Sequence, residues 1–192
     1  MDNNEKPKQT PSKFLIKIAL TALFAALTAA GAFIAIPVGV VPVVLQNLFA
    51  LLSGLILGPL LGAAAVGLYL LAGALSFPVF AGGAGGIARF AGPTGGFLVG
   101  YILMALTAGS IAGRPRLNVK TPLPRIIAAA AAGLLVVYVP GIIWLKVSLK
   151  LDWVRAFLTG FVPFIIGDFL KGIVAVLIAP RLRRVASDLF HR

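Results

Sequence analysis

The chain has 192 residues, of which 60% are hydrophobic and 11% charged, and its mean hydropathy of +1.05 indicates a protein that lies in lipid. The absence of cysteine and the single histidine, His191, exclude disulfides, thiol catalysis and a histidine-based metal site. The formal net charge of +12 is spread between apolar runs instead of lying on one soluble face, which argues against a nucleic-acid partner.

Six apolar runs are long enough to be membrane helices, and they lie at residues 14–35, 41–58, 60–80, 93–112, 123–145 and 156–180. Helices are expected because lipid cannot satisfy backbone polar groups, and the runs lack the period-two alternation of a β-barrel. No cleavage site follows the polar start, so the first run is expected to remain as a helix. We therefore predict an all-α polytopic membrane protein with six transmembrane helices. A cytoplasmic tail (1–13) precedes the transmembrane domain (14–184), and a second cytoplasmic tail (185–192) follows it.

The basic residues are distributed unevenly between the two predicted sides of the membrane. With the N-terminus inside, the inner set is Lys6, Lys8, Lys13, Lys17, Arg114, Arg116, Lys120, Arg125, Arg181, Arg183, Arg184 and Arg192. The outer set contains only Arg89, Lys146, Lys150 and Arg155. The positive-inside rule then places both termini in the cytoplasm.

The first predicted helix carries a stripe of small residues. Ala22, Ala26 and Ala30 share one face, with Ala25 and Ala29 beside them. Small residues at this spacing let another helix approach closely in lipid. That helix belongs either to the same chain, which is the more common case, or to a second protein.

The second predicted helix contains one rare polar residue and ends in a glycine motif. Gln46 lies near its outer end, where it either faces a cavity or bridges two helices. Gly54, Gly58 and Gly62 recur every four residues, with Pro59 directly after Gly58. This spacing predicts a sharp turn with close backbone approach before the third helix.

The segment FPVFAGGAGGIARFAGPTGGF, residues 77–97, is too apolar for a solvated linker. It lacks the strand of a dinucleotide fold and the Gly-Lys-Ser/Thr of a phosphate-binding loop, so any energy source is expected in another subunit. One interpretation is a loop whose bare backbone caps a buried small molecule, with Thr94 and Arg89 as additional donors. The other is tight packing of a re-entrant loop.

The last apolar run contains two charged residues, Asp168 and Lys171. Each costs about 2.5 to 3.5 kcal/mol at a helix centre on insertion scales, so both need a compensating environment. Their spacing of three places them on one helix face. Pro163 is expected to start this helix near the outer surface, which would open a ligand pocket to the outside. The alternatives are an internal ion pair, or a Lys171 that reaches the membrane surface.

Three of these segments together resemble the BioY family, the biotin-specific S components of energy-coupling factor (ECF) transporters. The likeness runs from about residue 20 to residue 184. It is carried by VPVVLQNLFALLSGLILGPLLGA (41–63), FPVFAGGAGG with GPTGGFLVGY (77–101), and VPFIIGDFLKGIVAVLIAPRLRR (162–184). Ile165 and Ile166 depart from the leucine-proline pair expected of many relatives.

The resemblance implies the S-component fold and a bacterial cell-membrane subunit that binds biotin from outside with high affinity. It also implies docking through the alanine stripe onto a transmembrane T component that carries two ATPase subunits. The residues expected in the biotin site are Asp168, Lys171, Gln46, Gly82, Gly83, Arg89, Thr94 and Tyr138. The resemblance implies the two charges, Gln46 and the glycine loop, whereas Arg89 lies in a more variable stretch and Tyr138 is an aromatic candidate to cover the thioether ring. Phe77, Phe80, Phe97, Tyr101 and Trp144 are further aromatic candidates to cover the thioether ring. Neither catalytic residues, a metal nor a cofactor is expected beyond the transported biotin.

Two other functions remain open at this point. An S component for another vitamin would share the architecture and differ only in its pocket. A non-catalytic structural subunit would use Asp168 and Lys171 as a packing pair. An intramembrane enzyme is disfavoured because the chain has five acidic residues, most of them outside the predicted spans.

Overall fold

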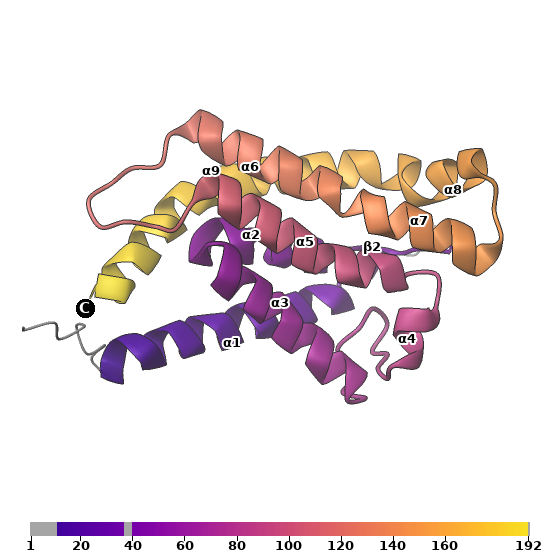
Figure 1. The fold of residues 1–192 in the computed structure, drawn as a ribbon, viewed down its shortest axis with the longest axis horizontal. Helices are drawn as coiled ribbons and strands as arrows, with labels where there is room; N and C mark the ends of the chain where they lie inside the picture. The colour runs from indigo at the N-terminus through magenta and orange to yellow at the C-terminus, as the bar shows by residue number, and fades with distance from the viewer. Residues whose placement is uncertain (1–10, 37–39, 192) are drawn as a thin grey trace, which may run out of the picture.

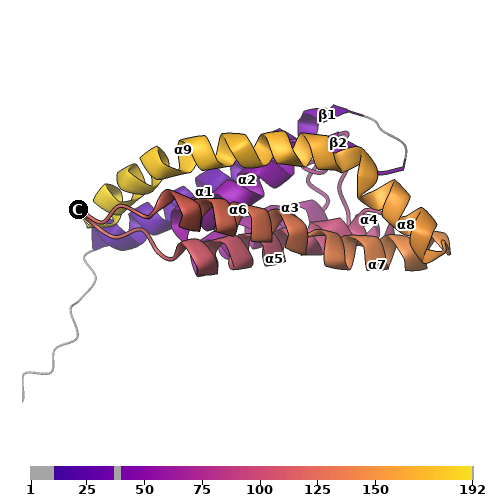
Figure 2. The same cartoon turned by 90° about the horizontal axis from the view of Figure 1, so that it is seen from above.

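A computed structural model describes residues 11–36 and 40–191 of the protein, which form an elongated bundle of long helices (Figures 1 and 2). The elements in chain order are α1 (Pro11–Phe33), β1 (Ala35–Ile36), β2 (Val43–Val44), α2 (Gln46–Leu57), α3 (Pro59–Ala74), α4 (Ala88–Ala91), α5 (Gly95–Ala112), α6 (Leu123–Val136), α7 (Tyr138–Leu149), α8 (Trp153–Gly160), the 3-10 helix η1 (Val162–Phe164) and α9 (Ile165–His191). The two strands form a single antiparallel pair, with Ala35 opposite Val44. The fold is therefore mostly helical, as predicted.

Among the described residues, four helical segments are long and apolar enough to cross a membrane. They are Lys13–Phe33, Gly95–Ala112, Leu123–Leu149 and Trp153–Phe190. The predicted spans at 41–58 and 60–80 correspond to the shorter apolar helices α2 and α3, with 12 and 16 residues. The chain is thus a multi-pass membrane protein.

Several element boundaries differ from those expected from the sequence. Residues 41–45 are not helical, because Pro42 favours an extended residue before it and the β-branched Val43 and Val44 form β2. The α6 and α7 helices are separated at Val137, three residues before Pro140, whose missing N–H disrupts the helical ladder. At the other end, α9 continues to His191, through most of the predicted C-terminal tail, and residues 1–10 of the N-terminal tail lie outside the described residues.

The centre of the bundle is built by α2 and α5, whose backbones touch. A side chain at Gly54 would lie 2.3 Å from the carbonyl oxygen of Ala105, and one at Gly62 would lie 2.6 Å from the Cα of Gly54. Gly58 has a φ of +83°, which only glycine adopts without strain, and it joins α2 directly to α3. The predicted sharp turn with close backbone approach is confirmed.

The alanine stripe of α1 is divided between the core and the surface. Ala25 is buried and Ala29 is half-buried where α1 packs on α2 and α3. Ala22, Ala26 and Ala30 are exposed. Ala25 and Ala29 therefore make the internal helix contact that small residues permit. The face of Ala22, Ala26 and Ala30 is not covered by the described part of the chain.

The bundle has two chemically different ends (Figures 1 and 2). At one end lie the start of α1, the loop between α5 and α6, and the C-terminal part of α9. The described basic residues of these segments are Lys13, Lys17, Arg114, Arg116, Lys120, Arg125, Arg181, Arg183 and Arg184. At the other end lie α4, β2, the α7–α8 connection and the four basic residues of the predicted outer set.

Candidate ligand site

Asp168 and Lys171 lie one turn apart in the first part of α9 and form a buried ion pair. Their Oδ1 and Nζ atoms are 2.9 Å apart, and the side chains are 9% and 8% exposed. Asn47 of α2 bridges the pair, donating to Asp168 Oδ1 at 2.8 Å and accepting from Lys171 Nζ at 2.9 Å. Two charges thus remain in the apolar interior because each has an opposite charge and an amide partner.

Tyr138 supplies the fourth member of this polar cluster. It is the first residue of α7, directly after the break at Val137, and its hydroxyl donates to Asp168 Oδ2. Tyr138 thereby reaches Asp168 of α9 from the start of α7. Both carboxylate oxygens of Asp168 therefore accept hydrogen bonds from other elements.

Gln46 lies beside Asn47 in the first turn of α2 and is 3% exposed. Its Oε1 accepts a hydrogen bond of 3.2 Å from the hydroxyl of Tyr69 on α3. Gln46 therefore bridges two helices, which was one of the two roles expected for it. It also lines a cavity, described next, which was the other.

Two adjoining cavities lie around these polar side chains. The acid cavity, of about 30 Å³, is lined by Asp168, Lys171, Asn47 and Tyr138. The loop cavity, of about 180 Å³, is lined by residues that include Gln46, Arg89 and Thr94. Both cavities share the lining residues Val41, Pro42, Val44, Phe97 and Tyr101. They form one candidate site that reaches from the α9 charges to the glycine-rich loop.

Six of the predicted binding residues line this candidate site, and two do not. Asp168, Lys171 and Tyr138 border the acid cavity, and Gln46, Arg89 and Thr94 border the loop cavity. Gly82 and Gly83 lie in the turn before α4, with positive φ angles of 74° and 69°, and they line neither cavity. Their contribution is to shape the loop whose neighbouring Phe80 and Ala81 do line it.

The glycine-rich loop is held against the bundle by specific contacts. The ring of Phe80 covers Gly73, the backbone N–H of Gly86 donates to the Gly73 carbonyl at 2.7 Å, and Trp144 Nε1 donates to the Gly92 carbonyl at 2.9 Å. A side chain at Gly96 would lie 2.3 Å from the carbonyl oxygen of Pro140. The loop therefore packs closely against the bundle, as one interpretation expected, and its residues also border the loop cavity.

Aromatic side chains surround the apolar part of the site. Phe80, Phe97 and Tyr101 border the loop cavity, and Phe97 meets Tyr138 edge-to-face at a centroid distance of 6.3 Å. The other two aromatic candidates, Phe77 and Trp144, are 58% and 37% exposed and line neither cavity. An apolar ring system would be enclosed from several sides here.

Asn47 is the one residue of the polar cluster that the sequence analysis missed. The available signal was its position next to Gln46 in an otherwise apolar run. The cluster offers an anionic acceptor and a cationic donor to a polar ligand group. Among the described residues, no group of three or more histidine, cysteine, aspartate or glutamate side chains is placed to hold a metal.

Comparisons with known proteins point to one family. The family model described as "BioY family" matches residues 4–188. The chain is 42% identical to the probable biotin transporter BioY of Pyrococcus horikoshii, covering 87% of this chain and 96% of that one. It is 41% identical to the biotin transporter BioY of Thermotoga maritima, covering 86% and 95%. A crystal structure of the S-component for biotin from an ECF-type ABC transporter superposes with a TM-score of 0.82 at 29% identity, covering 92% and 95%.

Proposed function

The chain belongs to the BioY family, and from this premise we propose that it is the biotin-binding S component of an ECF-type importer. The observation that carries the proposal is the buried cluster of Asp168, Lys171, Asn47 and Tyr138, which forms the polar end of a largely apolar cavity. Membership of a transporter family and the scarcity of acidic residues both favour a binding role over an enzymatic one.

The groups of biotin are complementary to the two ends of this site. Biotin has a ureido ring with two N–H donors and a carbonyl, an apolar thioether ring and a carboxylate tail. A tail carboxylate beside Asp168 would be repelled, so we place the ureido ring at the acid cavity, where Asp168 accepts from an N–H and Lys171 donates to the carbonyl. The tail then points to the exposed Arg89 in the loop cavity.

The cluster satisfies its own polar atoms. Every buried side-chain nitrogen and oxygen in the described part of the chain has a hydrogen-bond partner. Biotin binding on this proposal exchanges some of these internal hydrogen bonds for bonds to the ureido group. This exchange favours ligands that offer donors and an acceptor together, because an apolar ligand that displaced the internal hydrogen bonds would leave the charges unpartnered.

The proposed partners are a transmembrane T component and two ATPase subunits, as the resemblance implies. The exposed face of Ala22, Ala26 and Ala30 supports this, since small residues on a lipid-facing helix permit close approach of another helix. We propose six membrane-crossing helices, with α2 and α3 as the short ones, both termini in the cytoplasm, and no cofactor. Biotin would enter at the end of the bundle that carries the glycine-rich loop.

Ligand titration tests the proposal directly. The purified full-length chain is titrated in detergent with radiolabelled biotin, and separately with thiamin and riboflavin. We expect saturable binding of biotin alone. Binding of another vitamin with no response to biotin would identify an S component of different specificity, and flat curves for all three would favour a structural subunit.

A further inference from the structure

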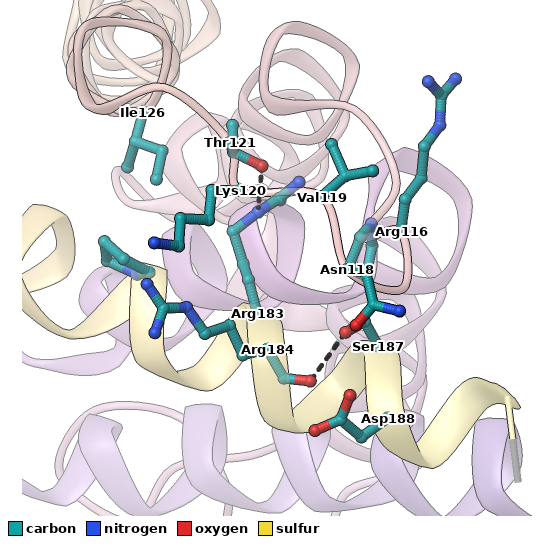
Figure 3. A pocket seen from close by; sticks show the side chains of 12 residues that line it. Arg116, Asn118, Val119, Lys120, Thr121, Ile126, Arg183, Arg184, Ser187 and Asp188 are labelled. Atoms are coloured by element: carbon teal, nitrogen blue, oxygen red, sulfur yellow. Dashed lines mark hydrogen bonds between the residues drawn. The ribbon is translucent and has the colours of Figure 1, made fainter.

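The basic end of the bundle contains a pocket that is separate from the ligand site. The basic pocket, of about 420 Å³, lies between the loop of residues 113–122 and the last turns of α9 (Figure 3). Its charged lining residues are Arg116, Lys120, Arg183, Arg184 and Asp188. Four cations therefore face a single carboxylate, which makes the pocket suited to an anion.

A second cavity adjoins the basic pocket and combines cations with apolar side chains. This groove, of about 560 Å³, is lined by Lys17, Leu57, Leu60, Leu61, Arg114, Pro115, Arg116 and Phe190. It shares Pro115 and Arg116 with the basic pocket. The two cavities thus offer a strongly cationic surface that continues into an apolar one.

The cations differ in whether their side chains already have hydrogen-bond or ion-pair partners in the protein. Arg183 is 4% exposed and donates to the carbonyls of Leu55, Ala112 and Gly113 and to Thr121 Oγ1, so it holds the loop to the ends of α2 and α5. The other cations are exposed or half-buried, and among the described residues their side chains form no ion pair or hydrogen bond. They are Lys17, Arg114, Arg116, Lys120 and Arg184.

Figure 3 shows how these groups are presented. Arg183 turns toward Thr121 and closes the inner wall, while the cationic ends of Lys120 and Arg184 lie on the same side of the pocket. Arg116 extends from the loop in a different direction. It also lines the adjoining groove. A phosphate group between Lys120 and Arg184 would meet an ammonium and a guanidinium, the two side-chain groups that bind phosphate best.

The position and the apolar groove favour a lipid over a free anion. Three candidate spans begin or end in this part of the bundle, at Lys13, Ala112 and Leu123, and the fourth ends at Phe190, which lines the groove. The cavities therefore lie near the ends of the apolar spans. Basic pockets between membrane helices at this level bind acidic lipid head groups. A free phosphate would use the cations but would gain nothing from the three leucines and Phe190.

We propose that the basic pocket and its adjoining groove form a binding site for an anionic phospholipid. The phosphate head group is held by Lys120 and Arg184, and an acyl chain covers Leu57, Leu60 and Leu61. Arg183 holds the loop in place through its own hydrogen bonds and is not a lipid ligand in this proposal. This site is independent of the proposed function, because its residues are not shared with the candidate ligand site.

Native mass spectrometry of the full chain in detergent tests the site. The protein is titrated with phosphatidylglycerol or with phosphatidylcholine of the same acyl chains, and the retained lipids are counted. We expect selective retention of phosphatidylglycerol. The double variant Lys120→Gln with Arg184→Gln should weaken that retention by roughly tenfold or more, since each cation contributes to anionic lipid binding.

A matched variant separates a defined site from general charge attraction. Lys13→Gln with Arg181→Gln removes the same two charges from the same end, at positions that line neither cavity, and should change retention less than about twofold. Equal losses in both double variants, or equal retention of the two lipids, would overturn the proposal. Displacement of phosphatidylglycerol by millimolar inorganic phosphate would also overturn it, because the site would then select a free anion.

Discussion

The buried carboxyl group of Asp168 has partners on three different elements. Lys171 is on the same helix, Asn47 comes from α2, and Tyr138 comes from α7. Removing one member of a buried charge pair leaves the other unpaired and is far more costly than removing both. Any change at Asp168 therefore acts on the proposed ligand contact and on Lys171 at the same time.

Asp168→Asn is expected to weaken biotin binding at least about 30-fold. The substitution keeps the shape of the side chain but removes the anionic acceptor, and losing one partner of a buried hydrogen-bonded charge costs about 2 kcal/mol or more. Equilibrium binding of radiolabelled biotin to the purified variant measures the effect.

Asp188→Asn is the matched control, because it makes the same chemical change on the same helix at the basic end. It should bind biotin like the unmodified chain. If Asp168→Asn elutes as a folded, monodisperse protein with unchanged affinity, the proposed role of Asp168 is wrong.

The charge pair was predictable from sequence, but its partners were not. A spacing of three places Asp168 and Lys171 on one face whatever the rest of the fold does. Asn47 is 121 residues from Asp168 in the chain, and no local pattern connects them. Tyr138 was expected as an aromatic side chain covering a ligand. Its hydroxyl bond to Asp168 joins residues 30 positions apart, and the continuous apolar run at 123–145 gives no sign of the helix break directly before it.

At the scale of elements, small residues determine which helices approach one another. The glycine motif of α2 and α3 was predicted correctly because a glycine followed by a proline ends one helix and starts the next in a sharp turn. The alanine motif of α1 was only half determined, since spacing shows which residues share a face but not which face meets the core. The structure divides that stripe into a packed part and an exposed part.

Gly62→Ala is expected to destabilise the protein by about 1 to 3 kcal/mol, because the added methyl group would meet the backbone of Gly54 at 2.6 Å. Gly67 is the matched control on the same helix, since a side chain there meets nothing within 4 Å. Gly67→Ala should be neutral or slightly stabilising. Thermal unfolding of both variants in detergent measures the difference, and equal melting temperatures would contradict the close packing of α2 on α3.

Ala26→Leu tests whether the exposed alanine face is the proposed partner surface. The larger side chain should leave biotin binding intact while preventing co-purification with the T component and abolishing biotin uptake, because a helix can no longer approach closely. Uptake assays in cells and affinity purification of the complex provide the two measurements.

Two further alanine variants serve as controls for that experiment. Ala128→Leu places the same side chain on the exposed face of α6 and should leave complex formation unchanged. Ala25→Leu places it in the core and should reduce folding itself. Normal association of the Ala26→Leu protein would assign the partner contact to another face.

At the scale of the whole molecule, the candidate ligand site and the basic pocket lie at opposite ends of the bundle (Figures 1 and 2). The glycine-rich loop, Arg89 and β2 border the ligand cavity at one end. The loop of residues 113–122 and the last turns of α9 carry the cations at the other. The positive-inside rule predicts that the basic end is cytoplasmic, and this orientation would direct the proposed biotin site outward.

Cysteine labelling in intact cells tests this orientation, since the unmodified chain has no cysteine. Ile87→Cys, at a 75% exposed position of the glycine-rich loop, is expected to react with a membrane-impermeant maleimide in intact cells. Leu117→Cys, at a 42% exposed position of the basic loop, is expected to react only after the membrane is permeabilised. The opposite labelling pattern would place the ligand cavity on the cytoplasmic side and the basic end outside. A biotin importer could not then load from the medium through this loop, so the same result would also remove the proposed direction of transport.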